Sequence, residues 1–355
     1  MADNEVRVPE KSLREFAERV FVRCGLSQED AAIEVDCLLW ANLRGVDSHG
    51  VLRIPSYVER TRKGSMNPKP NIKVLKETPA ILMLDADLAF GPVVAVLAMK
   101  KTMEKARIVG IGWCLVRNAT HVGALGYYSL MAAREGMAGL IVVSSPPNMA
   151  PYGARAAGIH NSPISIAVPA LRHRPLILDM ATSVVAGGKV SLAVDKGVSI
   201  PLGWGLDKEG NPTTDPHQAT VLLPVGGPKG SGLAVMFECL ASVMAGMPLQ
   251  EPVLRTRQSA WRGSSTRPVQ NVLVAAIDIS TFTDLEQYKA TIDSYIDGIR
   301  ALPKADGVAE VLVPGEPEDR VYDERSKNGI PLPLGTLQNL KAVAEQLELD
   351  FPFKL

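Results

Sequence analysis

The sequence predicts an α/β protein with a helical N-terminal part, and three observations support this fold class. Apolar residues recur at helical spacing over residues 12–24 and again over 31–39. From residue 113 onward, short apolar runs with the length of strands alternate with helical stretches. The composition, 46% hydrophobic and 21% charged over 355 residues, is that of a globular chain long enough for two or three subdomains.

Two helices are expected before residue 44. The first covers residues 12–24, and Gly25 follows directly where a helix can end in a left-handed residue. Ser27 is the expected N-cap of the second helix, with Asp30 three residues later in the place of a capping-box acid. Pro68 and Pro70 then predict an extended connection.

The remaining elements follow from the spacing of apolar residues and from glycine and proline. Strands are expected at 80–86, 113–117, 138–145, 165–168, 176–178, 272–279 and 311–314. Helices are expected at 92–107, 230–245, 285–299, 317–327 and 336–348, and residues 121–128 are expected to turn into a further helix that runs through Ala133. A Gly- and Pro-rich excursion covers 197–215, and no internal repeat is present.

Charge and cysteine content narrow the classes of partner. Lys plus Arg and Asp plus Glu are both 38, and no long basic run occurs, so nucleic-acid binding is not expected. No apolar run approaches the ~20 residues that span a bilayer, and residues 1–14 are too polar for a secretory leader. Cys24, Cys37, Cys114 and Cys239 lie far apart, which favours buried thiols in a reducing cytoplasm.

Residues 44–53, with the sequence RGVDSHGVLR, concentrate groups that can do chemistry. If Ser48 caps a helix that begins near His49, then His49, Arg53 and Tyr57 follow at intervals of four residues. Side chains at this spacing lie on one face of a helix. The sequence therefore predicts a proton donor, a fixed cation and a phenol on the same side of one helix.

The opposite face of this predicted helix is apolar, because Val51, Ile54 and Val58 can all pack inward. Pro55 works against a continuous helix, since proline lacks a backbone N–H. A kink or a break is therefore expected near Ile54.

The residue types in this stretch suit chemistry on a small carboxylate. Arg53 can hold a carboxylate with two parallel hydrogen bonds and keeps its charge. His49 can give or take a proton near neutral pH. A 2-oxo acid that is being reduced needs both an anchor for its acid group and a proton for its carbonyl oxygen. In the simpler alternative, Asp47 and Ser48 form a turn and a cap, and His49 is an ordinary polar residue.

Several common motifs are missing. Gly110-Ile111-Gly112 lacks the third glycine of a dinucleotide fingerprint, and Gly187-Gly188-Lys189 continues with Val190 where a phosphate loop needs Ser or Thr. The chain contains no Gly-x-Ser-x-Gly elbow of the kind found in serine hydrolases. The five histidines are scattered, so a metal site is not expected.

Three other stretches carry positive signals. Residues 226–232 are rich in glycine and precede an apolar helix, where Lys229 and free N–H groups favour an anion such as a pyrophosphate. The alternative is an ordinary turn with an exposed lysine. Asp179 ends a strand, where its carboxylate can hold a ribose, orient a histidine or cap a helix. His121 stands at a strand-to-helix turn, and local packing is the alternative to a role in a site.

Six ordered stretches together resemble the second malate/L-lactate dehydrogenase family. They are residues 44–53, 121–128, 179–182, 187–189, 227–230 and 314–316, and DKEGNPTTD at 207–215 fits as well. That family includes sulfolactate and ureidoglycolate dehydrogenases, diketogulonate reductase and piperideine-2-carboxylate reductase. The likeness covers nearly the whole chain, and it identifies a family without selecting a substrate.

The resemblance implies a non-Rossmann NAD(P)-binding fold with a largely antiparallel central sheet and a helical domain formed from both chain ends. Residues 1–75 and 317–355 would form the helical, substrate-side and dimer-forming domain. Residues 76–316 would form the α/β cofactor-binding region, in which 76–118 can make a small subdomain. The family resemblance further implies a homodimer.

The resemblance also implies roles for individual residues. The proton donor matches His49 in some members and His121 in others, and His49 is placed first because its partners share one predicted helix face. Arg53 matches the carboxylate-binding arginine, Tyr57 matches a neighbouring contact, and Ser48 is a partner of the substrate or of His49. The positions that match cofactor contacts are His121, Ser145, Leu178, Asp179, Met180, Ala181, Lys229, Gly315 and Glu316.

The expected function is that of an NAD(P)-dependent oxidoreductase that interconverts a small 2-oxo acid and its 2-hydroxy acid by hydride transfer. The cofactor would be NAD or NADP, without a metal. A first alternative is reduction of a cyclic imine acid such as piperideine-2-carboxylate or pyrroline-2-carboxylate. A second alternative is a nucleotide-binding protein without turnover. The expected location is the cytoplasm, with neither a nucleic-acid nor a membrane partner.

Overall fold

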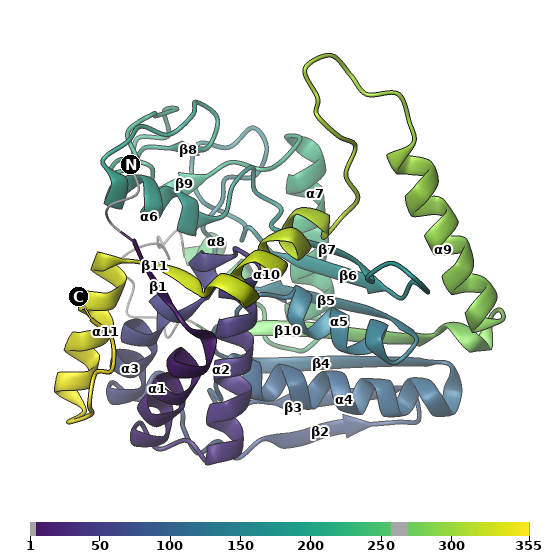
Figure 1. Ribbon diagram of the computed structural model, residues 1–355, viewed down its shortest axis with the longest axis horizontal. Coiled ribbons are helices and arrows are strands. Elements are labelled where there is room, and N and C mark those ends of the chain that lie inside the picture. Colours follow the sequence, from purple (N-terminus) through teal and green to yellow (C-terminus); the bar gives the residue numbers. More distant parts are fainter. Residues whose placement is uncertain (1–4, 257–268, 355) are drawn as a thin grey trace.

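A seven-stranded sheet forms the centre of the computed structural model, which describes residues 5–256 and 269–354 (Figure 1). The strand order is β2 (Lys73–Glu77), β3 (Ile81–Asp85), β4 (Ile111–Ala119), β10 (Gln270–Asp278), β5 (Met137–Ser144), β6 (Ile164–Val168) and β7 (Leu176–Met180). Only the neighbours β3 and β4 run parallel, and every other pair in this sheet is antiparallel. The expected mixed α/β fold with a largely antiparallel sheet is therefore confirmed.

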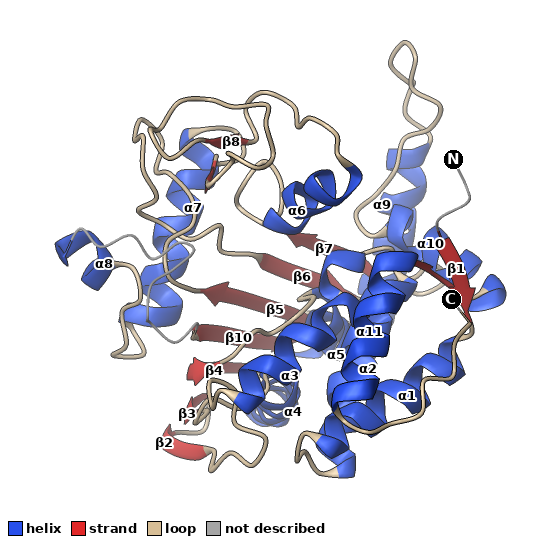
Figure 2. Ribbon diagram, turned by 90° about the vertical axis from the view of Figure 1, so that its left-hand side faces the viewer, coloured by secondary structure: helices blue, strands red, loops and turns tan. Residues whose placement is uncertain are grey.

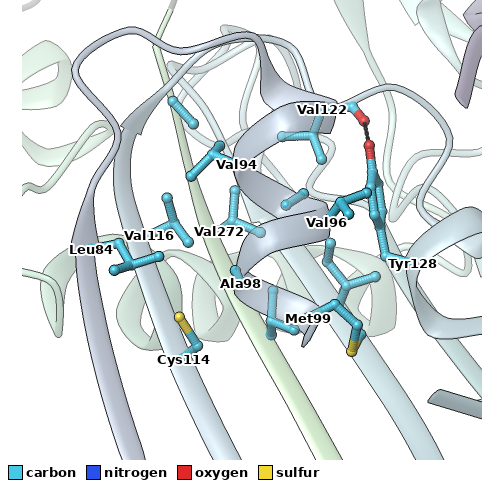
Figure 3. Close-up of a cluster of buried hydrophobic side chains, with 14 of the residues drawn as sticks. Leu84, Val94, Val96, Ala98, Met99, Cys114, Val116, Val122, Tyr128 and Val272 are labelled. Atoms are coloured by element: carbon cyan, nitrogen blue, oxygen red, sulfur yellow. Dashed lines mark hydrogen bonds between the residues drawn. The ribbon is translucent and has the colours of Figure 1, made fainter. Parts of the chain in front are cut away.

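Helices cover both faces of this sheet. On one face, α4 (Gly91–Val109) and α5 (Gly126–Arg134) pack against β4, β5 and β10. Figure 3 shows the resulting apolar cluster, in which Val94 of α4 lies beside Val116 and Val272 of the sheet. On the other face, α7 (Pro228–Glu238) continues into the π-helical turn η3 (Cys239–Val243), and Phe237 joins Leu273 in a separate cluster.

The two chain ends meet in one helical part (Figure 2). It contains α1 (Glu10–Arg23), α2 (Gln28–Leu43), α3 (Ile54–Arg62), α10 (Glu316–Asn328) and α11 (Leu334–Gln346), and β1 (Glu5–Val8) pairs with β11 (Ile330–Pro333). Phe16, Leu39 and Leu340 belong to the same buried cluster. The division into domains stays a prediction, and residues 1–4, 257–268 and 355 of its ranges lie outside the described residues.

The remaining elements lie in the excursions between strands. They are η1 (Asp47–His49), η2 (Val51–Arg53), α6 (Gly187–Lys196), β8 (Gly205–Leu206), β9 (Val221–Leu222), α8 (Glu251–Thr256), η4 (Ile279–Thr281) and α9 (Leu285–Arg300). Within the described ranges, no helix is both long enough and apolar enough to cross a membrane.

The expected helix boundaries near the N-terminus are confirmed. Gly25 has a φ of +103° and donates its N–H to Val22 after the end of α1. The Ser27 hydroxyl accepts the Asp30 N–H at 3.0 Å and so caps α2. Two C-terminal helices also occur where they were expected, as α10 and α11.

The strand expected at 311–314 is wrong, because these residues form no strand in the structure. The Ile177 N–H donates to the Pro314 carbonyl at 3.4 Å, and this single hydrogen bond to β7 does not extend into a ladder. Proline lacks the N–H that a ladder needs, and Gly315 turns the chain away with a φ of +88°. Strand β2 was not expected, because the sequence of Lys73–Glu77 shows no alternation of apolar and polar residues. In the structure every residue of this strand is exposed.

Candidate active site

The stretch that contains His49 and Arg53 forms two short 3-10 turns, η1 and η2, and α3 begins only at Ile54. The expected single helix that begins near His49 is therefore wrong, and His49 shares no helix face with Arg53 and Tyr57. Gly50 interrupts the turns with an extended backbone, at φ −91° and ψ −155°. Pro55 lies in the first turn of α3, so the expected break near Ile54 is confirmed.

The apolar side of this stretch packs as expected. Val51 and Ile54 are fully buried, and Val58 is nearly so. Burial of these side chains holds the polar groups of the same stretch at the edge of the helical core. Asp47 and Ser48 lie in the η1 turn, as the simpler alternative expected, and no side chain caps this turn.

Asn42 at the end of α2 fixes the two 3-10 turns. Its side-chain oxygen accepts the Val51 N–H at 2.8 Å, and its amide donates to Asp47 at 2.7 Å. A Cβ on Gly50 would lie 2.2 Å from that Asn42 oxygen, so any larger residue would displace Asn42 or the turn. Arg325 of α10 donates to both carboxylate oxygens of Asp47, at 2.7 and 3.0 Å. The turns are thus held from two sides.

The imidazoles of His49 and His121 are stacked, with ring centroids 5.4 Å apart and planes inclined by 25°. The Ser48 hydroxyl lies 2.9 Å from Nδ1 of His49, and the Tyr57 hydroxyl lies 2.6 Å from Nδ1 of His121. Among the described residues, no hydrogen bond reaches Nε2 of either ring. Each histidine is therefore held by one nitrogen and leaves the other for a ligand.

Arg53 lies beside these rings, and its charge adds to the effect of burial on their pKa values. Its Nε donates to the Ser48 carbonyl at 2.7 Å, which leaves the terminal nitrogens of the fork for a carboxylate. Burial and the charge of Arg53 lower the pKa of His49 to about 4. Burial, followed by the charges of Arg53 and His49, lowers the pKa of His121 well below its ordinary value. Both rings are therefore neutral at pH 7 in this state.

Three residues of the site were not predicted from the sequence. Arg60 and His160 also act on the charge of His121. Arg60 lies three residues after Tyr57 on α3, so helical spacing counted from Tyr57 would have indicated it. His160 comes from a distant loop and gave no signal. Gly188 starts α6 so close to the η1 turn that a Cβ would lie 2.5 Å from the Ser48 Cβ.

Most of the expected cofactor positions gather around the end of β7. Leu178, Asp179 and Met180 lie in β7, and Ala181 follows directly. The Asp179 carboxylate accepts the Gly126 N–H at 2.7 Å, which ties β7 to the helix that follows the His121 loop. Gly315 lies beside the same strand, since a Cβ there would be 3.1 Å from the Ile177 carbonyl oxygen.

The start of α7 has the features of an anion site. Gly226 and Gly227 have φ values of +58° and +59°, and no side chain caps the helix. Lys229 is exposed in the first turn. The Val225 N–H donates to the Thr182 carbonyl at 2.9 Å, and the buried Thr182 hydroxyl has no partner among the described residues. The free N–H groups expected from the sequence are not found, because Lys229, Gly230 and Ser231 donate to the carbonyls of residues 225–227 and Pro228 has no N–H. This helix start therefore offers a pyrophosphate the exposed lysine and the Thr182 hydroxyl.

Two expected cofactor positions are engaged elsewhere. The Ser145 hydroxyl donates to the Val269 carbonyl at 3.2 Å, and the Glu316 carboxylate pairs with Arg300 and Arg320 at 3.2 and 2.8 Å. In the described ranges, no hydrogen bond joins Ser145 or Glu316 to either stacked histidine. The described residues also contain no cluster of three or more His, Cys, Asp or Glu side chains suited to a metal.

Reduction of a 2-oxo acid requires a group that anchors the carboxylate and a group that gives a proton to the carbonyl oxygen. The η1 and η2 turns place Arg53 and His49 together, and the loop after β4 adds His121. The class that this arrangement defines is a dehydrogenase of small carboxylic acids.

Comparison with known proteins supports the same class. A family model described as malate/L-lactate dehydrogenase matches residues 8–341. The chain is 37% identical to L-sulfolactate dehydrogenase of Methanocaldococcus jannaschii over 93% of this chain and 94% of that protein. It is 36% identical to malate dehydrogenase of Pyrococcus horikoshii over 98% of this chain and 97% of that protein. The chain therefore belongs to the malate/L-lactate dehydrogenase family, as the resemblance implied.

Solved structures agree with this assignment. The M. jannaschii sulfolactate dehydrogenase superposes with a TM-score of 0.88 at 35% identity, covering 98% of each chain. The Δ1-piperideine-2-carboxylate reductase of Pseudomonas syringae superposes with a TM-score of 0.79 at 27% identity, covering 96% of this chain and all of that one. The chain is thus a dehydrogenase by family, and the imine reductase is the more distant of these two neighbours.

Proposed function

We propose that the protein is an NAD(P)-dependent dehydrogenase that interconverts a small 2-oxo acid and the corresponding 2-hydroxy acid. The observation that carries this proposal is the position of the Arg53 fork beside the stacked rings of His49 and His121. Relatives named malate and sulfolactate dehydrogenase support the 2-hydroxy acid class. We favour acids of that kind over a cyclic imine, because the piperideine-2-carboxylate reductase is less similar in sequence and in structure.

Arg53 is proposed to anchor the substrate carboxylate. Its Nε is already engaged with the Ser48 carbonyl, so the remaining fork has a fixed direction. A fixed, always charged fork selects a planar carboxylate and sets the place of the adjoining carbonyl carbon. Tyr57 is buried and holds His121, so it shapes the position of the proton donor more directly than it contacts the acid.

We propose that His121 exchanges the proton with the substrate oxygen. Burial raises the pKa of the Tyr57 phenol, so this hydroxyl stays protonated and can donate to Nδ1 of His121. A substrate carboxylate held by Arg53 offsets the charge that lowers the pKa of this ring, so His121 can take up a proton. The imidazolium then gives its Nε2 proton to the carbonyl oxygen as that oxygen gains charge, and the ring returns to its neutral form. His49, held by Ser48, is the second candidate for the proton donor. The sequence analysis placed His49 first because Arg53 and Tyr57 were expected on its helix face, and the structure shows no such shared face.

A bound nicotinamide dinucleotide supplies or accepts the hydride in this reaction. The residues proposed to hold it are Leu178 to Ala181, Lys229, Gly315, Glu316 and Ser145, with the start of α7 at its pyrophosphate. Both NAD and NADP remain candidates. We further propose that this mostly antiparallel sheet binds the cofactor in a manner distinct from the doubly wound nucleotide-binding fold.

We also propose that the protein is a homodimer. The outward face of α7 and η3 is apolar and exposed, while Phe237 on the inward face packs on the sheet. The exposed members of this face are Leu233, Met236, Leu240, Val243 and Met244. Lys229 lies at the start of this face, but from Leu233 to Met244 the face contains no exposed charge that would call for a partner of opposite charge. A second copy of the chain is therefore the occupant that it suits. Sedimentation of the purified protein would test this.

The cytoplasmic location stays a proposal. Support comes from Cys24, Cys37, Cys114 and Cys239, none of which is paired in the structure. Unpaired thiols are typical of a reducing compartment.

The decisive experiment follows the absorbance of reduced nicotinamide with NADH and NADPH against oxaloacetate, pyruvate, sulfopyruvate and a cyclic imine acid. Oxidation of either cofactor by a 2-oxo acid is the expected result. Oxidation by the imine alone would replace the proposed substrate class with the alternative. Cofactor binding without oxidation by any acid would leave a nucleotide-binding protein without turnover.

A further inference from the structure

Two arginines connect the end of α2 with opposite ends of α10. Arg44, which is buried, donates to the Gly315 carbonyl at 3.1 Å and forms an ion pair with Asp319 in the first turns of α10. Arg325, near the other end of the helix, donates to both oxygens of Asp47 at 2.7 and 3.0 Å. The helix α10 is therefore fastened at its start and near its end to the same region of the chain.

Each end of α10 meets a different part of the proposed site. Gly315 and Glu316, at the start of the helix, are proposed cofactor contacts. Asp47, at the far end, begins the η1 turn that contains Ser48 and His49. The helix has 13 residues, which corresponds to about 20 Å at ~1.5 Å per residue. A helix of this length moves as one unit, so its two ends cannot change position independently.

The contact between Arg325 and Asp47 has the geometry of a strong ion pair. The guanidinium is bidentate, and the Arg325 side chain is 13% exposed whereas the Asp47 side chain is 42% exposed. The two parallel hydrogen bonds fix the orientation of the pair more firmly than a single contact would. Short 3-10 turns have poor internal hydrogen bonds. The place of η1 therefore depends on Asn42 and Arg325 more than on the turn itself.

We propose that Arg325 is a positioning residue that acts through Asp47. Its contact makes the orientation of His49 and Arg53 depend on whether a cofactor occupies the position at Gly315 and Glu316. This inference rests on the proposed function. A cofactor that orders the start of α10 would, through the far end of the same helix, favour the arrangement of the turns that receives the acid. Because such coupling is reciprocal, a bound acid would tighten cofactor binding by the same factor.

The test compares Arg325→Gln, Arg325→Lys and Asp47→Asn with the control Glu324→Gln. Glu324 is the neighbour of Arg325 on α10 and forms an ion pair with Arg7 at 2.7 Å, so the control also removes one ion pair from this helix. Hydrogen exchange of residues 44–53 is measured with and without saturating NADH or NADPH. Cofactor affinity is measured by fluorescence, and kcat and KM are measured with the best 2-oxo acid of the panel.

In the wild-type protein, the cofactor is expected to slow exchange over residues 44–53. In Arg325→Gln and Asp47→Asn this cofactor-dependent protection should disappear, while cofactor affinity changes by less than about threefold and kcat/KM falls about 10- to 100-fold. Arg325→Lys should recover part of both effects, because lysine keeps the charge but not the fork. Glu324→Gln should behave as the wild type.

Several outcomes would overturn the inference. If Arg325→Gln fails to fold by circular dichroism, Asp47→Asn decides, since it keeps the side-chain size and removes only the charge. Wild-type protection in either folded variant would refute the role of Arg325. A wild-type enzyme that turns over normally but shows no cofactor-dependent protection would refute the inference and leave the proposed function intact. A wild-type protein that neither binds nor oxidises reduced nicotinamide would refute both.

Discussion

The hydroxyl of Tyr57 lies 2.6 Å from Nδ1 of His121, although one residue belongs to α3 and the other to the loop after β4. This contact joins the helical part of the chain to the sheet at the proposed site of proton transfer. The contact also allows the role of His121 as proton donor to be tested separately from that of His49, because only His121 is held by this phenol.

Tyr57→Phe should therefore lower turnover without removing the acid anchor. Loss of the hydroxyl frees Nδ1 of His121 and lets the ring change its tautomer, so kcat should fall about tenfold while KM changes little. His121→Ala should lower kcat about 100-fold or more, and His49→Ala should have a smaller effect. Single-turnover rates with bound reduced cofactor would measure all three. A larger loss in His49→Ala than in His121→Ala would reverse the assignment of the donor.

Arg53→Lys should raise KM for the acid far more than it weakens cofactor binding. Lysine keeps the charge but lacks the planar fork, so about 10-fold or more of the acid affinity should be lost. Cofactor affinity, measured by fluorescence titration, should stay within about twofold, because Arg53 is not among the proposed cofactor contacts. Unchanged kinetics with the acid would remove Arg53 as the anchor.

The charge of Arg53 should also be visible in the titration of His49. Burial and Arg53 hold the pKa of this ring at about 4. Arg53→Gln removes a positive charge that opposes the imidazolium, so the pKa should rise toward its ordinary value of 6.5. A carboxylate bound to Arg53 in the wild type should also raise the pKa of His49, because it offsets the charge of the guanidinium. Ring-proton NMR of the free protein across pH 3 to 8 is the measurement, and a pKa that stays fixed in Arg53→Gln would contradict the account.

Glu34 provides a test of stability that is independent of the site. It is fully buried, and neither carboxylate oxygen has a partner among the described residues. Burial raises its pKa from 4.5 to about 8. Between these values the folded state holds a proton that the unfolded state has released, so stability falls as pH rises through this window, by at most about 1.4 kcal/mol per pH unit.

Glu34→Gln should remove this dependence, because glutamine cannot ionise. The variant should unfold at a higher denaturant concentration than the wild type at pH 8.5, and this advantage should vanish near pH 4.5. Urea melts at the two pH values would show the difference. An identical pH dependence in both proteins would mean that Glu34 is ionised or hydrated in the folded state.

Gly50→Ala should disrupt the turns that carry the site. The added Cβ would lie 2.2 Å from the Asn42 oxygen that holds Val51, so either Asn42 or the turn must move. A loss of about 1–3 kcal/mol in stability is typical of such overpacking, and kcat/KM should fall with it. Gly335→Ala in α11 is the matched control, since open space surrounds that position. Equal activity of the two variants would show that the turns tolerate displacement.

The sequence was sufficient to predict most helices, the central strands and three residues that meet in the candidate site, namely Arg53, His49 and His121. Arg53, His49 and His121 could be selected because their residue types suit one chemistry and their motifs occur in a recognisable order. The helix face proposed for His49 was wrong because a distant contact, between Asn42 and the Gly50–Val51 backbone, overrides local spacing. Local pattern cannot reveal such a contact.

Residues contributed by distant segments were also beyond the reach of sequence patterns. Arg325 reaches Asp47 across the fold, and His160 approaches His121 from another loop. Neither has a spacing relation to its partner. Gly188 belongs to the stretch 187–189, one of the six that carry the family resemblance, but its closeness to Ser48 could not be predicted because it depends on how α6 docks.

The ion pair between Arg325 and Asp47 has a consequence for biosynthesis. The ribosome completes His49, Arg53 and His121 long before it adds α10, so the nascent chain carries the reactive groups without the guanidinium that sets one of them in place. A polypeptide interrupted before α10 would thus be catalytically immature even with its central sheet assembled, and translation of the last helices is the step that completes the enzyme.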